Sequence, residues 1–591
     1  MKQFLKFTLA SALGFIIAGI VMFFITIGFF AGVTKLLSGK QEASAVEDGS
    51  ILHLTFSQPI YDRTTYDPFP NLNWKDVDQW ESPGMAESLR LINDAAQDEH
   101  IKGIYLDLSM LQAGLATVEE LRDALINFKS TGKFIISYAE VYTQLSYYLA
   151  SVSNEIYLNP AGIMEFKGLS AQVTFYQHAL EKLGVKMQVM RHGKFKSAVE
   201  PFELDSMSPA SREQSYTLIH TIWDHIVNDI SLSRDVPTAK LNDIADSLLI
   251  RTPDDAMRLE LVDDVLYEDE VLDILREKCG LEAEAKLPLL SLKKYAHSKR
   301  PEKSYSKDAI AVIYATGTIE SGNDADEETM GSDKIAKTIR DARNNKLIKA
   351  IVVRVNSPGG SAMASDVIWR EMTLARMQKP VVISMGDVAA SGGYYISCAA
   401  DTIVAGPSTI TGSIGVFGIL PNFETLLEEK LGINFDTVKT NRYSDFGNLA
   451  RPLYAQEEKA IMDMIESIYD DFITKVSDGR GIPKSLVDSI GQGRVWSGTD
   501  ARKIGLVDVT GGLETAIEIA AGMAKVENYR LLDLPRQKNL LETILGDLPD
   551  DMVAEKVQEE LGPVAPYMHT LKWLQQARGP QAMMPYTLRV Q

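Results

Sequence analysis

The chain has 591 residues, of which 45% are hydrophobic and 24% are charged, and its formal net charge is −20. These proportions exclude a mainly disordered or fibrous chain, and the acidic balance argues against nucleic acid as a partner, because nucleic-acid binders present a basic face. The two cysteines cannot form a disulfide framework, and no Cys/His cluster has the spacing of a structural zinc site.

A long apolar segment lies near the N-terminus. Residues 7–33 carry no charged side chain, and a helix needs about 20 apolar residues to cross a bilayer. The alternative is a cleaved signal peptide, whose apolar core is usually about 7–15 residues long; Ala43-Ser44-Ala45 would then be the cleavage sequence. The length favours an uncleaved single-pass anchor, so we expect residues 1–46 to hold the chain in a membrane.

Beyond this segment, short apolar runs alternate with amphipathic stretches. Residues 103–108, 350–355 and 381–385 have the composition of buried strands, whereas residues 362–377 and 455–476 have helical periodicity. This alternation is typical of a parallel sheet covered by helices, so the sequence predicts an α/β fold.

The chain also contains an internal duplication. Residues at a nearly constant offset match in type: Ser137 with Ser384, Tyr147 with Tyr394, Ile156 with Ile403, and Asp263 with Asp508. We therefore predict two copies of one fold, residues 47–291 and 308–535, joined by a solvated linker at residues 292–307. Residues 536–591 form a proline-containing tail without a counterpart in the first copy, and we interpret it as a partly disordered or docking segment.

Most standard catalytic motifs are absent from the sequence. It contains no P-loop, no HExxH metal motif and no GxSxG nucleophile elbow. No histidine lies between His297 and His569, which excludes a Ser-His-Asp triad within the second repeat. A serine nucleophile in this repeat would need another base, and a desolvated lysine is able to serve as one.

Three glycine-rich blocks in the second repeat are candidates for chemistry. Residues 356–361, with Gly359 and Gly360, suit an oxyanion hole or, alternatively, a type II turn. Ser391 follows a predicted strand and precedes a helical stretch. It is either a nucleophile or an ordinary helix cap. Ser413 belongs to the third block, which lines a site or forms a tight loop.

The first repeat keeps the scaffold but lacks these groups, since Gln144 stands where the second repeat has Ser391. Its own distinctive block, residues 193–202, contains Lys196. A lysine acting as a base needs its pKa lowered from about 10.4 to about 7–8 by desolvation. The alternatives are a solvated surface lysine at this position, or Lys194 or His192 as the base.

Together, the four blocks NSPGGS, AASGGYY, TGSIGVFG and FKSAVEPF resemble the signal peptide peptidase A (protease IV) family in its long, duplicated bacterial form. The resemblance implies two tandem Clp-protease/crotonase-like repeats after an N-terminal transmembrane helix. It also implies a serine endopeptidase that needs no metal or cofactor and degrades signal peptides after their release from preproteins.

Carried over by position, the resemblance assigns Ser391 as the nucleophile and Lys196 as the general base. Ser413 resembles the serine that orients the lysine, and Gly359 and Gly360 resemble the amides of the oxyanion hole. The family further implies a bowl-shaped homotetramer in the plasma (inner) membrane, with its catalytic part on the extracytoplasmic side. An apolar peptide substrate is expected to bind in extended form along a sheet edge.

Several points stay open from the sequence. Asp387 stands where the family usually has a small or apolar residue, and we expect its side chain to face solvent. The residues that form the dyad lie on different repeats, and the sequence does not decide whether they meet within one chain or between two. The alternative functions are a crotonase-like acyl-CoA enzyme, and a membrane scaffold or protease acting on other membrane proteins.

Overall fold

The computed structural model describes residues 46–66, 81–108, 110–282, 284–299, 306–323, 329–536 and 581–583. The predicted membrane anchor, residues 7–33, lies outside the described residues. Within the described ranges, no helix combines the length and the hydropathy needed to cross a bilayer.

A parallel sheet with the strand order β8-β6-β5-β4-β1-β9 forms the centre of the first repeat. Its strands are β1 (Ser50–Leu54), β4 (Ile101–Asp107), β5 (Phe134–Tyr142), β6 (Glu155–Met164), β8 (Asp264–Val265) and β9 (Leu289–Ser291). The helices are α2 (Met85–Gln97), α3 (Leu115–Ser130), α4 (Gln144–Ala150), α5 (Gln177–Leu183), α6 (Glu200–Glu203), α7 (Pro209–Arg234), α8 (Thr238–Asp246), α9 (Pro253–Arg258), α10 (Glu268–Cys279) and α11 (Leu292–Ser298). A two-stranded ribbon pairs β2 (Thr65–Tyr66) with β3 (Glu81–Ser82).

The second repeat has a larger sheet with the order β19-β17-β15-β13-β10-β21, and β16 and β20 extend it beside β15. Its strands are β10 (Ala309–Thr316), β13 (Ile348–Ser357), β15 (Val381–Ala390), β16 (Thr402–Ala405), β17 (Ile410–Gly412), β19 (Val495–Ser497), β20 (Val509–Thr510) and β21 (Arg530–Leu534). The helices are α12 (Ser332–Asn344), α13 (Ala362–Arg376), α14 (Gly392–Ser397), α15 (Ala455–Arg480), α16 (Lys484–Ile490), α17 (Gly498–Lys503) and α18 (Leu513–Ala524).

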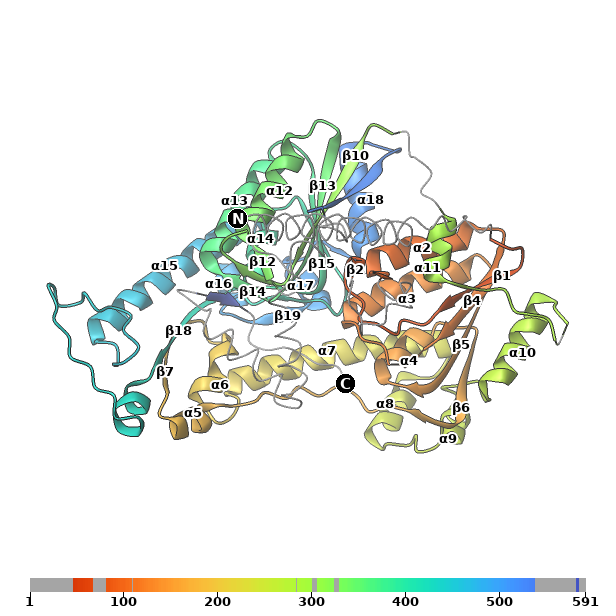
Figure 1. The fold of residues 1–591 in the computed structure, drawn as a ribbon, viewed down its shortest axis with the longest axis horizontal. Helices are drawn as coiled ribbons and strands as arrows, with labels where there is room; N and C mark the ends of the chain where they lie inside the picture. Colours follow the sequence, from red (N-terminus) through yellow and green to blue (C-terminus); the bar gives the residue numbers. More distant parts are fainter. Residues whose placement is uncertain are drawn as a thin grey trace, which may run out of the picture.

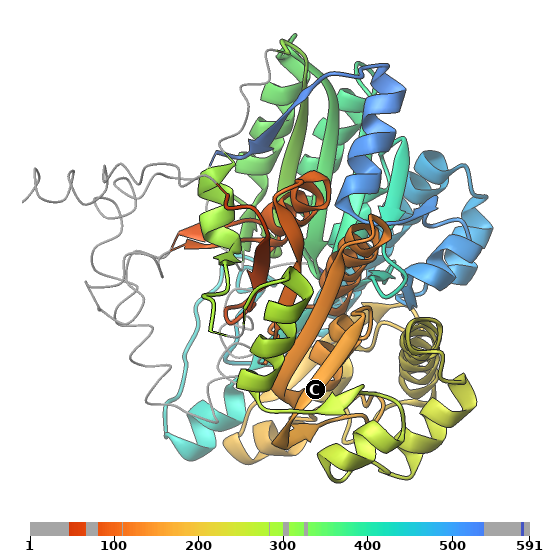
Figure 2. The same ribbon diagram turned by 90° about the vertical axis from the view of Figure 1, so that its right-hand side faces the viewer.

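The predicted strands and helices are confirmed at these positions. β13 and β15 are buried along most of their length, because helices cover both faces of a parallel sheet and the strands must be apolar on both sides. Figure 1 shows the two sheets side by side, with the long helix α7 below the sheet of the second repeat, and the turned view in Figure 2 shows helices packed against the sheets. The predicted α/β class therefore describes this chain.

Equivalent hydrogen bonds recur in both repeats. The Tyr147 hydroxyl donates to the Leu261 carbonyl at 2.8 Å, and the Tyr394 hydroxyl donates to the Leu506 carbonyl at 2.9 Å. The long helix α7 of the first repeat and the long helix α15 of the second also occupy equivalent positions in the order of elements. The tandem duplication predicted from the sequence is thus confirmed.

The predicted linker begins as ordered structure. Residues 292–298 form α11, and its Tyr295 is buried in the core of the first repeat. The Tyr295 hydroxyl donates to the Asp98 carboxylate at 3.0 Å. Its lysine-rich composition suggested a solvated linker, whereas the structure buries one face of the helix through Leu292 and Tyr295.

A third sheet joins the two repeats, with the order β12-β11-β14-β22-β18-β7. Its strands are β7 (Lys186–His192), β11 (Thr318–Glu320), β12 (Thr329–Gly331), β14 (Gly359–Ser361), β18 (Val416–Asn422) and β22 (Gln581–Met583). β7 comes from the first repeat and pairs antiparallel with β18 of the second along its whole length. This pairing brings the residues that follow β7 against the second repeat.

Buried charges provide another contact between the repeats. Arg354, in β13, is fully buried and forms ion pairs with Asp62 and Glu120 of the first repeat, each at 2.7 Å. Removing one partner of such a cluster leaves an uncompensated buried charge, which is strongly destabilising. The two repeats are therefore coupled through their interiors as well as through the shared sheet.

Candidate active site

The turn after β7 places Lys196 beside the second repeat. Gly193 has a φ of 106°, a conformation that favours glycine, and a Cβ added there would lie only 2.5 Å from the Gln492 carbonyl oxygen. The Phe195 amide donates to the same oxygen at 2.8 Å. The next residue, Lys196, thus enters a space formed by the second repeat.

Ser391 lies at the end of β15, directly before α14. Its φ is 55° and its ψ is −111°, which is unusual for a residue with a side chain and is the kind of backbone strain that clusters at active sites. The Ser391 amide donates to the Gly412 carbonyl at 2.8 Å. Its hydroxyl makes no capping hydrogen bond to α14, so it does not act as an ordinary helix cap.

The structure brings Lys196, Ser391 and Ser413 together within one chain. Lys196 Nζ lies 2.8 Å from Ser391 Oγ, 3.0 Å from Ser413 Oγ and 3.1 Å from the Ser413 carbonyl oxygen. All three side chains are fully buried. A nucleophile and a base within hydrogen-bonding distance, with a third group holding the base, form the arrangement that covalent catalysis requires.

Burial controls the protonation of Lys196. Two glycines allow close packing: a Cβ on Gly493 would lie 2.6 Å from Lys196 Cβ, and one on Gly415 would lie 3.2 Å from Lys196 Cδ. The Phe417 ring centroid is 6.0 Å from Nζ. Desolvation by this packing holds the pKa of Lys196 well below its ordinary value, which favours the neutral amine that a general base needs.

Gly359 and Gly360 lie close to the residue that follows Ser391. A Cβ on Gly392 would lie 3.1 Å from both Gly359 Cα and Gly360 N. A Cβ on Gly360 would overlap the Ile319 carbonyl, so this position requires glycine because the backbones approach closely. The segment 359–361 is the strand β14 rather than a simple type II turn.

The rival bases lie elsewhere. His192 Nδ1 is 2.8 Å from the Glu466 carboxylate, and its ring stacks on Tyr469 with the centroids 3.7 Å apart. Lys194 is exposed, with its ammonium 4.7 Å from the Phe195 ring centroid. The base that contacts Ser391 is therefore Lys196.

Comparison with known proteins identifies the family of the chain. The sequence model of peptidase family S49 matches residues 127–282, which contain Lys196, and again residues 373–527, which contain Ser391 and Ser413. The chain belongs to peptidase family S49. The Clp protease model matches residues 301–407.

Relatives of known name agree with the family. The chain is 35% identical to Serine protease SPPA, chloroplastic, of Arabidopsis thaliana, over 78% of this chain and 69% of the relative. It is 35% identical to Protease 4 of Salmonella typhi over 84% of this chain and 81% of the relative. It is 32% identical to Putative signal peptide peptidase SppA of Enterococcus faecium over 37% of this chain and 64% of the relative. The chain is thus a serine protease of the S49 type.

The first S49 repeat uses the position equivalent to Ser391 for structure. The Gln144 side-chain oxygen accepts hydrogen bonds from the amides of Lys167 and Gly168, at 3.0 and 2.9 Å. Its amide group donates to the Gly168 carbonyl at 3.2 Å. These contacts hold the loop at residues 167–168 in place, so Gln144 has a structural role at the position equivalent to Ser391.

The expectation that Asp387 faces solvent is wrong. Its carboxylate accepts hydrogen bonds from the Thr117 amide at 3.0 Å and from the Thr117 hydroxyl at 2.8 Å. Because α3 of the first repeat packs on β15, burial raises the pKa of this carboxyl group. Asp387 therefore joins the two repeats, and no Lys196–Asp387 contact is among those that position the lysine.

Sequence reasoning missed Gly493 and gave no role to Gly415. Gly415 lies within the block that contains Ser413, so its position was a usable signal. Gly493 follows Gln492 in a loop with no catalytic motif, and its role depends on long-range packing against Lys196. A single sequence carries no local signal for such a contact.

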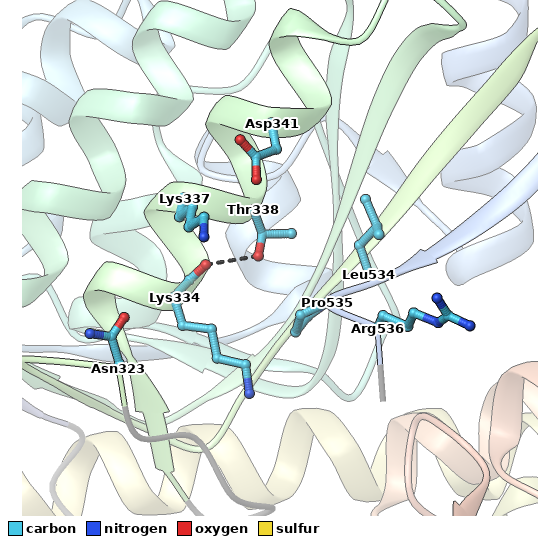
Figure 3. A pocket seen from close by; sticks show the side chains of 8 residues that line it. All are labelled: Asn323, Lys334, Lys337, Thr338, Asp341, Leu534, Pro535 and Arg536. Carbon is cyan, nitrogen blue, oxygen red and sulfur yellow. Dashed lines mark hydrogen bonds between the residues drawn. The ribbon is translucent and has the colours of Figure 1, made fainter. Parts of the chain in front are cut away.

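The surface pocket drawn in Figure 3 is separate from the dyad. Its volume is about 420 Å³. It is lined by Asn323, Lys334, Lys337, Thr338, Asp341, Leu534, Pro535 and Arg536. The Thr338 hydroxyl in it donates to the Lys334 carbonyl one helical turn earlier, at 2.8 Å. No nucleophile in this pocket is paired with a base, so its lining offers no second site for peptide hydrolysis.

Proposed function

We propose that the chain is a membrane-anchored endopeptidase with a Ser391/Lys196 dyad, whose substrates are signal peptides released from preproteins. The observation that carries the dyad is the 2.8 Å contact between Lys196 Nζ and Ser391 Oγ, made by two fully buried side chains. A crotonase-like acyl-CoA enzyme does not require such a pair. The contact therefore favours peptide hydrolysis over that alternative.

The proposed reaction begins with proton transfer from Ser391 to the neutral amine of Lys196. Ser391 Oγ then bonds to the scissile carbonyl carbon. The backbone amides of Gly359 and Gly360 stabilise the oxyanion, once the Gly359 amide turns away from Ser357 Oγ, to which it donates at 3.2 Å in this structure. The lysine ammonium returns the proton to the leaving amine as the peptide C–N bond breaks. Water, activated by the same lysine, hydrolyses the acyl-enzyme and releases Ser391.

Ser413 is the proposed orienting group. Its hydroxyl and its carbonyl both lie near Lys196 Nζ, at 3.0 and 3.1 Å. These two oxygen atoms accept hydrogen bonds from the amine. The lone pair of the neutral nitrogen is then directed toward the Ser391 hydroxyl. Because both are uncharged, they orient the lysine without the large rise in its pKa that a carboxylate would cause.

Gly360→Ala is expected to lower kcat by about 10²–10³-fold, the usual effect of losing an oxyanion-hole donor. The added Cβ would overlap the Ile319 carbonyl, so β14 would have to move away from Ser391. Steady-state kinetics would measure kcat, with the unfolding temperature recorded alongside. Gly522→Ala is the matched control, because Gly522, in α18, has open space around its added Cβ. A wild-type kcat in Gly360→Ala would show that β14 does not form the oxyanion hole.

The preference for signal peptides rests on the chain's relatives and on its N-terminal segment. One relative carries the name signal peptide peptidase, and residues 7–33 lack charge, as an anchor in a bilayer requires. An enzyme held at the membrane meets apolar peptides where they are released. We also propose a single-pass position in the plasma membrane, an extracytoplasmic catalytic part, a homotetramer and Clp-protease/crotonase-like folds for both repeats.

This substrate class is tested with synthetic peptides. We expect kcat/KM for a signal peptide to exceed that for a polar peptide of equal length by at least about tenfold, because apolar side chains add binding energy in apolar subsites. The full chain in detergent micelles is assayed with both peptides, and products are quantified by mass spectrometry. Equal kcat/KM values would contradict the signal-peptide preference and leave a protease with other substrates.

A further inference from the structure

A buried amide side chain binds the residues on both sides of Lys196. Gln214, in α7, is 1% exposed. Its Nε2 donates to the Phe195 carbonyl oxygen at 2.9 Å and to Ser197 Oγ at 2.8 Å, and its Oε1 accepts from the Val495 amide at 3.3 Å. A backbone carbonyl only accepts and a backbone amide only donates, so these partners fix the orientation of the amide group.

Phe195 and Ser197 directly precede and follow Lys196 in the chain. A single amide group that binds both of them holds the backbone from which the lysine side chain extends. The Lys196 carbonyl is held as well, because the Arg191 guanidinium donates to it at 3.1 Å. With its neighbours held in this way, the Cα–Cβ bond of Lys196 has a fixed direction.

The third hydrogen bond of Gln214 reaches the segment that positions the two serines. Val495, in β19, lies opposite Gly412 of β17, and the Gly412 carbonyl accepts from the Ser391 amide at 2.8 Å. The Ser413 amide donates to the carbonyl of the residue before Val495 at 2.7 Å. Because α7 packs on β19 (Figure 1), Gln214 connects the backbone around the lysine to the backbone that carries its partners.

The position of Lys196 Nζ depends strongly on this backbone. Nζ lies 2.8 Å from Ser391 Oγ and also contacts two oxygens of Ser413, and the lysine stem between Nζ and Cα is long and flexible. A small turn of the backbone is amplified along such a stem. A misplacement of about 1 Å at a catalytic group lowers the rate by about 10²-fold.

We propose that Gln214 is a positioning residue, which holds Lys196 in reach of Ser391 by connecting the backbone on both sides of the lysine to β19. The inference rests on the proposed dyad, because Gln214 acts only through Lys196. An apolar side chain would fill the same space but would leave the lysine backbone without this connection. Loss of the amide should therefore lower kcat and leave KM unchanged, since Lys196 acts in the chemical step and not in peptide binding.

Gln214→Met in the full chain tests the proposal, because methionine has a similar length and cannot form these hydrogen bonds. We expect kcat for a peptide substrate to fall about 10²-fold, with KM unchanged. Gln144→Met is the matched control. Gln144 is also buried and makes three hydrogen bonds, all to the loop at residues 167–168, and its replacement should keep the wild-type kcat. Unfolding temperatures of both variants are recorded alongside.

The same change in a Lys196→Met chain separates positioning of the lysine from general support of the fold. The rate at which a fluorophosphonate labels Ser391 is measured for each single variant and for the double variant. Residues that act through one another have non-additive effects, so Gln214→Met should cause no further slowing once the lysine is replaced. A residue that only supports the fold would slow labelling by the same factor in both backgrounds.

Ser197→Ala is a milder variant, because it removes only one of the hydrogen bonds of Gln214. It should lower kcat by about 2–10-fold, the effect of one hydrogen bond, again with KM unchanged. A wild-type kcat in Gln214→Met, or in Ser197→Ala if Gln214→Met does not fold, would overturn the positioning role, as would an equal loss in Gln144→Met or equal slowing of labelling in both backgrounds. Full activity in Lys196→Met would instead overturn the proposed dyad and, with it, this role of Gln214.

Discussion

Ser391→Ala should lower kcat for peptide hydrolysis by at least about 10⁴-fold, the scale seen when the nucleophile of a serine protease is removed. Ser391 Oγ is the hydroxyl 2.8 Å from Lys196 Nζ, and alanine leaves the base without a nucleophile to activate. The fold should persist, because the Ser391 hydroxyl makes no capping hydrogen bond. Product formation from a synthetic peptide, followed by mass spectrometry, measures the loss.

Ser397→Ala is the matched control for this variant. Ser397 is equally buried and lies in α14, where its hydroxyl donates to the Gly393 carbonyl at 2.6 Å. It faces the helix backbone rather than Lys196, so kcat should stay near the wild-type value. Substantial hydrolysis by Ser391→Ala, or an equal loss in Ser397→Ala, would show that the nucleophile is another residue.

Lys196→Met should lower kcat by about 10²–10⁴-fold, the usual contribution of a general base, and should not reduce stability at neutral pH. Methionine matches the apolar stem of lysine and fills most of its volume. It also removes a group whose pKa burial holds well below the ordinary value. Steady-state kinetics and denaturant unfolding measure the two effects.

The sign of the stability effect follows from proton binding. Between the lowered pKa of folded Lys196 and the ordinary value near 10.5, the unfolded chain binds more protons at this site than the folded chain. The contribution of Lys196 to the free energy of unfolding therefore rises with pH through this window. Lys196→Met should lose that part of the slope, whereas Lys194→Met, a change at an exposed lysine, should keep both the slope and the activity. A marked loss of stability in Lys196→Met at pH 7 would contradict the neutral buried amine.

Much of the scaffold could be predicted from the sequence. β13 and β15 contain the short apolar runs 350–353 and 381–383, and such runs identify buried strands without any knowledge of their partners. The repeated spacing of Tyr147 and Tyr394 revealed the duplication, because each hydroxyl makes the same hydrogen bond in its own repeat. These features are local or periodic, and a single sequence records them.

The assembly of the site was harder to predict from the sequence than the scaffold. The pairing of β7 with β18 brings Lys196 to Ser391. No local sequence pattern indicates that a strand of one repeat pairs with a strand of the other. From the sequence alone, Asp387 is expected to be a surface carboxylate. In the structure it accepts hydrogen bonds from the Thr117 amide and hydroxyl, which belong to α3 of the first repeat. Composition and motif spacing select the residue types, whereas long-range packing decides which of them meet.

The dyad is tested most directly by the pH dependence of covalent labelling at Ser391. The full chain and Lys196→Met are treated with a fluorophosphonate across a pH series, and the modified residue is located by peptide mass spectrometry. The wild type should be labelled at Ser391, at a rate that rises with pH and levels off well below the pKa of an exposed lysine, while Lys196→Met should lose this fast labelling. Labelling at another residue, or an identical pH profile in Lys196→Met, would contradict a Ser391/Lys196 dyad.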